Sequence, residues 1–98
     1  MEVVYARCAG LDVHKKLIVA CVRLIDGGRI LRTKERFGTT TAELIRLAAW
    51  MTQHKVTHAA MESTGVYWKP VWHVLEPDFQ LILANAQHVK AVPVASQT

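Results

Sequence analysis

Hydrophobic and polar residues follow a strand-like pattern through the first part of the chain. Residues 7–13 form a short apolar run, and residues 17–25 form a longer one, rich in β-branched side chains and interrupted only by Arg23. The turn Asp26-Gly27-Gly28 supplies residues that tolerate the positive φ of a tight hairpin. Residues 29–37 form a third predicted strand, with residues 30, 32, 34 and 36 on one face and residues 31, 33, 35 and 37 on the other, and its many charges are typical of a solvated edge. Three consecutive strands are therefore predicted.

The spacing of apolar residues changes to that of a helix after Gly38. Thr40 and Glu43 fit a capping box, in which each side chain satisfies a free amide at the helix start. The predicted helix runs to about residue 54. Its apolar stripe falls at i, i+3, i+4 and i+7, at Leu44, Leu47, Ala48 and Met51.

The remainder of the chain predicts a strand, a second helix and a further strand. Residues 56–61 form the predicted fourth strand. Thr64 is the predicted cap of the second helix, Pro70 fits in its first turn, and the helix ends near Glu76-Pro77. Residues 79–83 are predicted to be a fifth strand, buried on both faces.

The resulting order βββαβαβ predicts an α/β fold of the ribonuclease H-like type. An antiparallel meander is followed by right-handed crossovers, which gives a mixed five-stranded sheet with flanking helices. In this arrangement the first strand lies at the centre of the sheet, beside the fourth. Residues near the carboxyl ends of these two strands are therefore expected to lie side by side.

Two carboxylates occupy those matching positions. Asp12 follows the apolar run 8–11, and Glu62 follows the run 56–61. Two such groups about 5 Å apart repel by roughly 3 kcal/mol at an effective dielectric near 20, so together they favour a bound cation. Mg²⁺ or Mn²⁺ takes oxygen ligands, and a pair of such ions can cut a phosphodiester. Asp12 and Glu62 are thus the candidate metal-binding and catalytic residues.

The predicted site lacks the further carboxylates that such metal pairs commonly use. Asp26 falls in a distal turn, Glu43 in a helix cap, and Glu76 and Asp78 at the opposite end of the sheet, so weak metal binding is expected. Basic and histidine residues near the same end of the sheet are candidates for contacts to a phosphate backbone: His14, Lys15, Lys16, His88 and Lys90. A solvated turn explains His14, Lys15 and Lys16 equally well.

Bulk properties are compatible with a small nucleic-acid-binding protein. The chain has 98 residues, 51% of them hydrophobic, and a formal net charge of +4, which mildly favours a polyanionic partner. The longest fully apolar stretch is far too short to span a bilayer and no signal peptide is evident, so we predict a cytoplasmic protein. Cys8 and Cys21 lack CxxC spacing and are predicted to be free thiols, opposite each other if the first hairpin turns at His14 and Lys15.

Three stretches carry a resemblance to a known family. Residues 10–16 (GLDVHKK), 61–72 (MESTGVYWKPVW) and 84–90 (ANAQHVK) resemble the amino-terminal domain of the DEDD transposases of bacterial insertion sequences, the insertion-sequence-110 family. The resemblance implies a RuvC-like fold and a Mg²⁺-dependent site whose first Asp is Asp12 and whose Glu is Glu62. It also implies DNA as partner and DNA transposition as process. It leaves open a guide RNA encoded by the element and a homo-oligomer.

The end of the chain departs from the family pattern. Family members continue after the Val-Pro at positions 92 and 93 into a helix with an Asp-x-x-Asp pair, and then into a domain with a serine nucleophile. Residues 1–93 are therefore expected to be a partial, truncated RuvC-like domain and residues 94–98 a divergent tail, inactive in strand transfer alone. Two alternatives are a non-catalytic nucleic-acid-binding module and, less favoured, an ATP-binding domain of the actin and sugar-kinase type.

Overall fold

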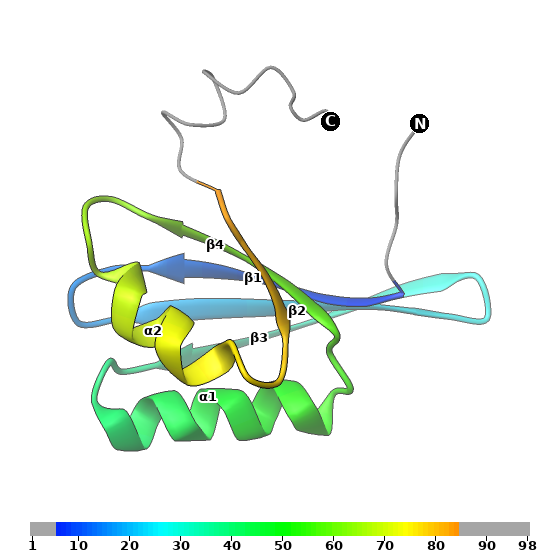
Figure 1. The fold of residues 1–98 in the computed structure, drawn as a ribbon. Coiled ribbons are helices and arrows are strands. Elements are labelled where there is room, and N and C mark those ends of the chain that lie inside the picture. The colour runs from blue at the N-terminus through cyan, green and yellow to red at the C-terminus, as the bar shows by residue number, and fades with distance from the viewer. Residues whose placement is uncertain (1–5, 85–98) are drawn as a thin grey trace.

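The computed structural model describes residues 6–84. This part of the chain folds into five strands and two helices in the predicted order βββαβαβ (Figure 1). They are β1 (Arg7–Val13), β2 (Ile18–Asp26), β3 (Arg29–Phe37), α1 (Thr41–Gln53), β4 (His58–Ser63), α2 (Trp68–Leu75) and β5 (Gln80–Leu83).

The strands form one mixed sheet in the order β3-β2-β1-β4-β5. β1 pairs antiparallel with β2, which pairs antiparallel with β3, whereas β4 is parallel to both β1 and β5. The predicted ribonuclease H-like sheet, with the first strand at its centre beside the fourth, is confirmed. β3 is the exposed edge strand that its charges indicated.

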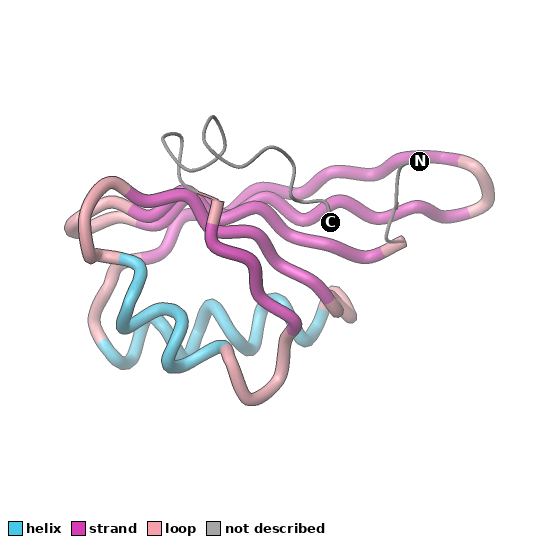
Figure 2. Tube along the Cα trace, turned by 45° about the horizontal axis from the view of Figure 1, so that its top comes forward, coloured by secondary structure: helices cyan, strands magenta, loops and turns pink. Residues whose placement is uncertain are grey.

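Both helices lie on the same side of the sheet (Figures 1 and 2). Side chains alternate across each strand, so every second residue of β1 and β2 faces the helices, and most of these residues are buried, including Leu11 and Val13. α1 contributes its predicted stripe to this core: Leu44, Leu47 and Met51 are buried, and Ala48 is partly buried against them. We refer to the other surface of the sheet, which no described helix covers, as the far face.

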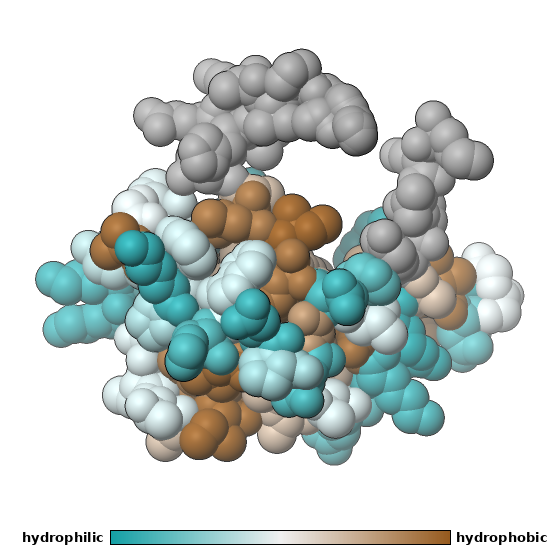
Figure 3. Space-filling model, viewed as in Figure 1, coloured by the Kyte–Doolittle hydropathy of each residue, from teal (hydrophilic) through white to brown (hydrophobic). Residues whose placement is uncertain are grey.

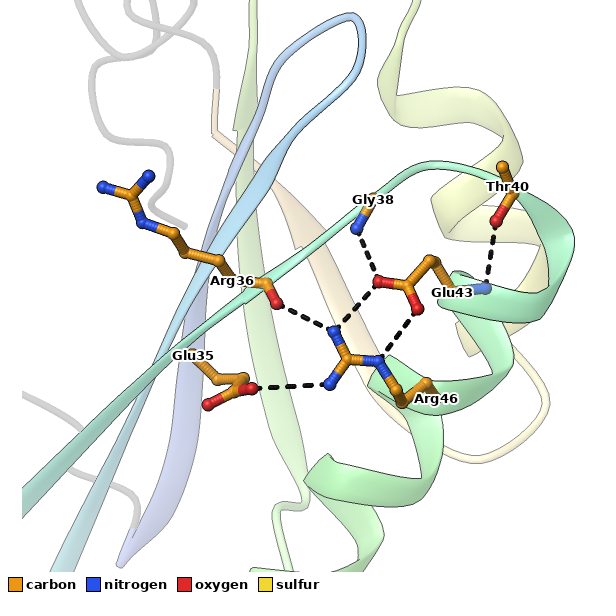
Figure 4. A network of polar contacts seen from close by, with 6 residues as sticks. All are labelled: Glu35, Arg36, Gly38, Thr40, Glu43 and Arg46. Atoms are coloured by element: carbon orange, nitrogen blue, oxygen red, sulfur yellow. Dashed lines mark hydrogen bonds and ion pairs between the residues drawn. The ribbon is translucent and has the colours of Figure 1, made fainter.

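The start of α1 is held by a network of charges and backbone groups (Figure 4). The Oγ1 of Thr40 accepts a hydrogen bond from the Glu43 amide at 3.3 Å, which is one half of the predicted capping box. The other half differs, because the Glu43 carboxylate accepts from the amide of Gly38 at 2.8 Å. Arg46 donates two bonds of 2.9 Å to the same carboxylate and lies over the ring of Phe37, 4.3 Å from its centroid.

The first hairpin turns one residue later than expected. The amide of His14 donates to the carbonyl of Leu17 at 2.8 Å, so four residues make the turn and Val13 pairs with Ile18. As a result Cys21 is opposite Gly10, and Cys8 is opposite Arg23. The predicted cysteine pairing was wrong, because it assumed a tighter turn; both thiols are free.

Two further predictions about boundaries were wrong. β4 begins at His58 and not at 56, because the amide of Val56 still bonds to the carbonyl of Met51 and Lys55 ends the helix at a φ of 58°. Thr64 does not cap α2, whose first residue is Trp68 and whose cap residue, Tyr67, makes no side-chain bond. A turn through Gly65, at a φ of 77°, fills the intervening residues.

Of the remaining predictions for α2 and β5, one is confirmed and one was wrong. Pro70 is the third residue of α2 and lies in its first turn, as predicted. The prediction that β5 is buried on both faces was wrong, because Ile82 on its far face is 59% exposed. Apolar and polar residues are interspersed on the side of the molecule that carries α2 and β5 (Figure 3).

A candidate metal site on the far face of the sheet

Asp12 and Glu62 are paired neighbours in the sheet. The parallel register of β1 and β4 places Asp12 opposite Glu62, one residue before each strand ends. Adjacent strands are roughly 4.8 Å apart, so the two side chains leave the sheet side by side. The predicted adjacency of the two carboxylates is therefore observed.

The alternation of β1 and β4 decides which face carries the pair. Leu11 and Val13, on either side of Asp12, are buried toward the helices, as are the two neighbours of Glu62. Asp12 and Glu62 must therefore point to the far face, and both are exposed there. The hydrophobic effect orients the carboxylates indirectly, by fixing the residues between which they lie.

His14 contacts the first carboxylate directly. Its Nε2 atom lies 3.2 Å from Oδ2 of Asp12, with about half of each side chain exposed to solvent. His14 was predicted either to contact a phosphate backbone or to lie in a solvated turn, and its contact with Asp12 was not predicted. The signal was present in the spacing, because residues i and i+2 at the end of a strand lie on the same face.

The other predicted phosphate contacts have different outcomes. Lys15 and Lys16 lie in the turn between β1 and β2 and are exposed, with the carbonyl of Lys15 accepting a hydrogen bond from Thr39 Oγ1 at 3.2 Å. Both lysines thus lie at the end of the sheet that carries the two carboxylates, and both are exposed there. His88 and Lys90 lie outside the described residues.

The donor set suits a hard divalent cation but is small. Within residues 6–84 no group of three or more His, Cys, Asp or Glu side chains gathers to hold a metal ion. Two carboxylates still fit Mg²⁺, which keeps several waters and is often bound through one or two carboxylates together with phosphate oxygens of a substrate. The arrangement can therefore hold a cation most firmly when a phosphate is also present.

The two tryptophans of α2 have a structural role. Trp68 and Trp72 pack edge to face, with ring centroids 5.8 Å apart, and both are partly buried against the core. This agrees with the prediction that they pack against the sheet. They lie on the helix side, opposite the carboxylates.

Solved structures with the same architecture include a Holliday junction resolvase and RuvC. The fowlpox virus Holliday junction resolvase matches with a TM-score of 0.61 at 12% identity, over 90% of this chain and 72% of the resolvase, and that protein is also known in complex with Holliday junction DNA. Thermus thermophilus RuvC matches with a TM-score of 0.57 at 16% identity, over 88% of this chain and 68% of RuvC. These likenesses establish a RuvC-like fold.

The same fold also occurs in an exopolyphosphatase. The enzyme from Cytophaga hutchinsonii matches with a TM-score of 0.57 at 10% identity, over 84% of this chain but only 35% of the enzyme. The fold therefore does not by itself separate a resolvase from a phosphatase. Sequence must make that distinction.

No helix within residues 6–84 is both long and apolar enough to cross a membrane.

The sequence comparison decides the family. No curated protein matches this chain in sequence. The family of DEDD transposases of the IS110 type matches residues 9–97, a range that contains both carboxylates and nearly the whole chain. The chain belongs to this transposase family, whose members act in DNA recombination.

Proposed function

We propose that Asp12 and Glu62 form the metal-binding part of a phosphodiester-cleaving site that acts on DNA during transposition. The observation that carries this proposal is their register: two exposed carboxylates lie opposite each other on adjacent parallel strands, on the face that no described helix covers. Membership of a transposase family supplies the process and DNA as the substrate.

The chain's own residues would act mainly by position. A bound Mg²⁺ would supply charge stabilisation at the phosphodiester. Asp12 and Glu62, exposed near the carboxyl ends of β1 and β4, would hold the cation. His14, in contact with Asp12, is placed to orient that carboxylate or to hydrogen-bond a phosphate oxygen. Lys15 and Lys16 extend the positive charge beside it.

We further propose that these residues do not complete strand transfer by themselves. A two-metal site uses more carboxylates than the pair found here, and residues 6–84 provide no third ligand. Weak metal binding, strengthened by DNA phosphate, is the expected behaviour. A labelled DNA duplex incubated with this chain and Mg²⁺ should remain uncut.

The metal site can be tested by thermal stabilisation with Mn²⁺. A ligand that binds only the folded state adds about 1.4 kcal/mol of stability at ten times its Kd. Asp12→Asn and Glu62→Gln should each abolish the Mn²⁺-dependent rise in melting temperature. Adding a DNA oligonucleotide should lower the Mn²⁺ concentration that the wild type needs, because DNA phosphate supplies further oxygen ligands and such coupling is reciprocal.

Matched controls remove carboxylates from the opposite end of the sheet. Glu76→Gln and Asp78→Asn change exposed acidic residues in the turn before β5, and both variants should keep the full response to Mn²⁺. An equal Mn²⁺ response in Asp12→Asn and in these controls would contradict the proposal.

A second candidate function is binding without catalysis. It is favoured by the absence of a third metal ligand within residues 6–84 together with the surplus of positive charge. In that case DNA would bind equally well with and without Mn²⁺. The ATP-binding alternative has only the shared fold in its favour, since the residues after Asp12 are Val13, His14 and two lysines, and none is small enough to let the backbone approach phosphates closely.

A further inference from the structure

The far face of β2 and β3 carries a group of basic side chains. Residues 30, 32, 34 and 36 of β3 share a face, because side chains alternate along a strand. Three of them are basic and exposed: Arg32, Lys34 and Arg36. Arg23 of β2 lies directly opposite Arg32. We call these four residues the cation row.

Register connects the cation row to the two carboxylates. Arg36 pairs with Val19, Val19 pairs with Asp12, and Asp12 pairs with Glu62. Residues paired in this way point to the same side of a sheet, so the row shares the far face with the candidate metal site. Arg36 lies level with the carboxylates, and the row runs from there toward the turn at Asp26.

These charges are not neutralised by neighbouring residues. Within the described part of the chain, no side chain of the cation row takes part in an ion pair or a hydrogen bond. The far face of β2 and β3 carries no acidic residue, because Asp26 and Glu35, the acidic residues of these strands, alternate to the helix side. Arg36 extends away from the network around Arg46, on the other side of the strand (Figure 4).

Two details show an energetic cost of this arrangement. Like charges directly opposite each other in an antiparallel pair are destabilising, and Arg23 is opposite Arg32. The Nε atom of Arg23 is also buried without a hydrogen-bond partner among the described residues. An anionic partner lying on this face would reduce the repulsion between Arg23 and Arg32.

The spacing of the row suits a phosphate backbone. Residues i and i+2 of a strand are roughly 6.8 Å apart, so the three cations of β3 form an evenly spaced line along the edge of the sheet. The end of the line borders a hollow of about 410 Å³, whose described lining is Val19, Lys34, Glu35 and Arg36. One of these lining residues, Val19, is paired with Asp12 in the sheet.

We propose that the cation row binds the phosphate backbone of the DNA strand that is presented to Asp12 and Glu62. The proposal rests on the proposed function for the identity of the strand. The row then sets the direction in which the strand leaves the site: across β2 toward β3, and along the edge of the sheet. DNA fits better than an acidic polypeptide, because a regular line of cations next to a metal site matches a repeating phosphate.

The test compares two double variants with equal loss of charge. Lys34→Gln/Arg36→Gln removes two cations of the row, and the control Arg29→Gln/Lys55→Gln removes two exposed cations, at the far end of β3 and after α1. Binding of a labelled duplex is measured by fluorescence anisotropy at several KCl concentrations. The slope of log K against log salt should become shallower by about 1.8 in the first variant, at about 0.9 per lost phosphate contact, and stay unchanged in the control.

Further arms separate the ways in which the proposal can fail. If both double variants lose the same slope, the DNA contacts are non-specific and the proposal is overturned. If polyglutamate displaces the duplex as well as unlabelled DNA does at equal charge concentration, the partner is an acidic polypeptide and the proposal is also overturned.

The response to Mn²⁺ distinguishes this proposal from the proposed function. Lys34→Gln/Arg36→Gln should keep the stabilisation by Mn²⁺ that Asp12→Asn loses. If Lys34→Gln/Arg36→Gln keeps the wild-type salt slope and Asp12→Asn loses the Mn²⁺ response, the cation-row proposal is overturned and the metal-site proposal holds. If the slope of Lys34→Gln/Arg36→Gln becomes shallower and Asp12→Asn keeps the Mn²⁺ response, the metal-site proposal is overturned and the cation row remains a nucleic-acid surface.

Discussion

The two sides of strand β3 differ in whether their charged side chains have partners of opposite charge. On the helix side, Glu35 lies 3.4 Å from Arg46, which also binds Glu43 and covers the ring of Phe37. On the far face, Arg32 and its basic neighbours have no such partner among the described residues. Residues adjacent in sequence, in one strand and at one edge, thus have opposite electrostatic surroundings.

This difference separates charges that serve folding from charges that are available to a partner. Helix α1 lies across from one side of β3 and brings a complementary set of groups with it, so the charges there are satisfied internally. The far face has no described element opposite it. Its charges raise the energy of the isolated fold slightly, which natural surfaces tolerate where binding compensates.

The largest effects should separate the two faces of the whole sheet. Leu47 of α1 is fully buried against the helix side, whereas Ile82 of β5 is 59% exposed on the far face. Leu47→Ala should lower the free energy of unfolding by about 2–5 kcal/mol, because it leaves a cavity. Ile82→Ala should change it by less than about 0.5 kcal/mol. Urea denaturation measures both, and equal losses would show that the far face is packed against something.

A smaller effect should follow the charges on the helix side of β3 as pH falls. Hydrogen bonds from Arg46, and then from the amide of Gly38, lower the pKa of Glu43 from 4.5 to about 2. A lowered pKa in the folded state means that the stabilisation is fully present above pH 4.5 and is lost as pH falls through 2. Glu43→Gln should flatten the stability profile in this window, as measured by urea denaturation between pH 5 and pH 2.

Arg46→Gln tests whether the guanidinium is the cause of that pH dependence. It removes the largest contribution to the lowered pKa of Glu43 and should flatten the same window. A profile as steep as that of the wild type in either variant would assign the acid sensitivity to other carboxylates.

The smallest effect should have the opposite sign and come from the far face. Arg32→Gln removes one member of the like-charged pair with Arg23 and should raise the free energy of unfolding by about 0.2–1 kcal/mol at low salt. Lys34→Gln is the matched control, because its partner across the strand is the uncharged Cys21. The gain should shrink in 1 M KCl, where charge interactions are screened, and a gain that salt does not change would have a cause other than repulsion.

The sequence by itself determined the elements and the adjacency of the two carboxylates. Strand alternation, the apolar stripe of α1 and the Asp26-Gly27-Gly28 turn are local signals, because burial imposes a period of two or 3.6 on the chain. The order of elements then placed β1 beside β4, since the crossover rules leave few topologies. Asp12 and Glu62 followed from these local patterns, and their role at a metal stays a prediction.

Only the tertiary structure decided the features that depend on register and on distant partners. The four-residue turn after β1 placed Cys21 opposite Gly10, and a shift of one residue would have changed every pair in the hairpin. Three features join groups that only the folded chain brings together. The Glu43 carboxylate accepts a hydrogen bond from the amide of Gly38 and not from that of Thr40, His14 contacts Asp12, and Arg36 is aligned with the carboxylates. Sequence periodicity reports which face a residue occupies, but packing between elements fixes what it meets there.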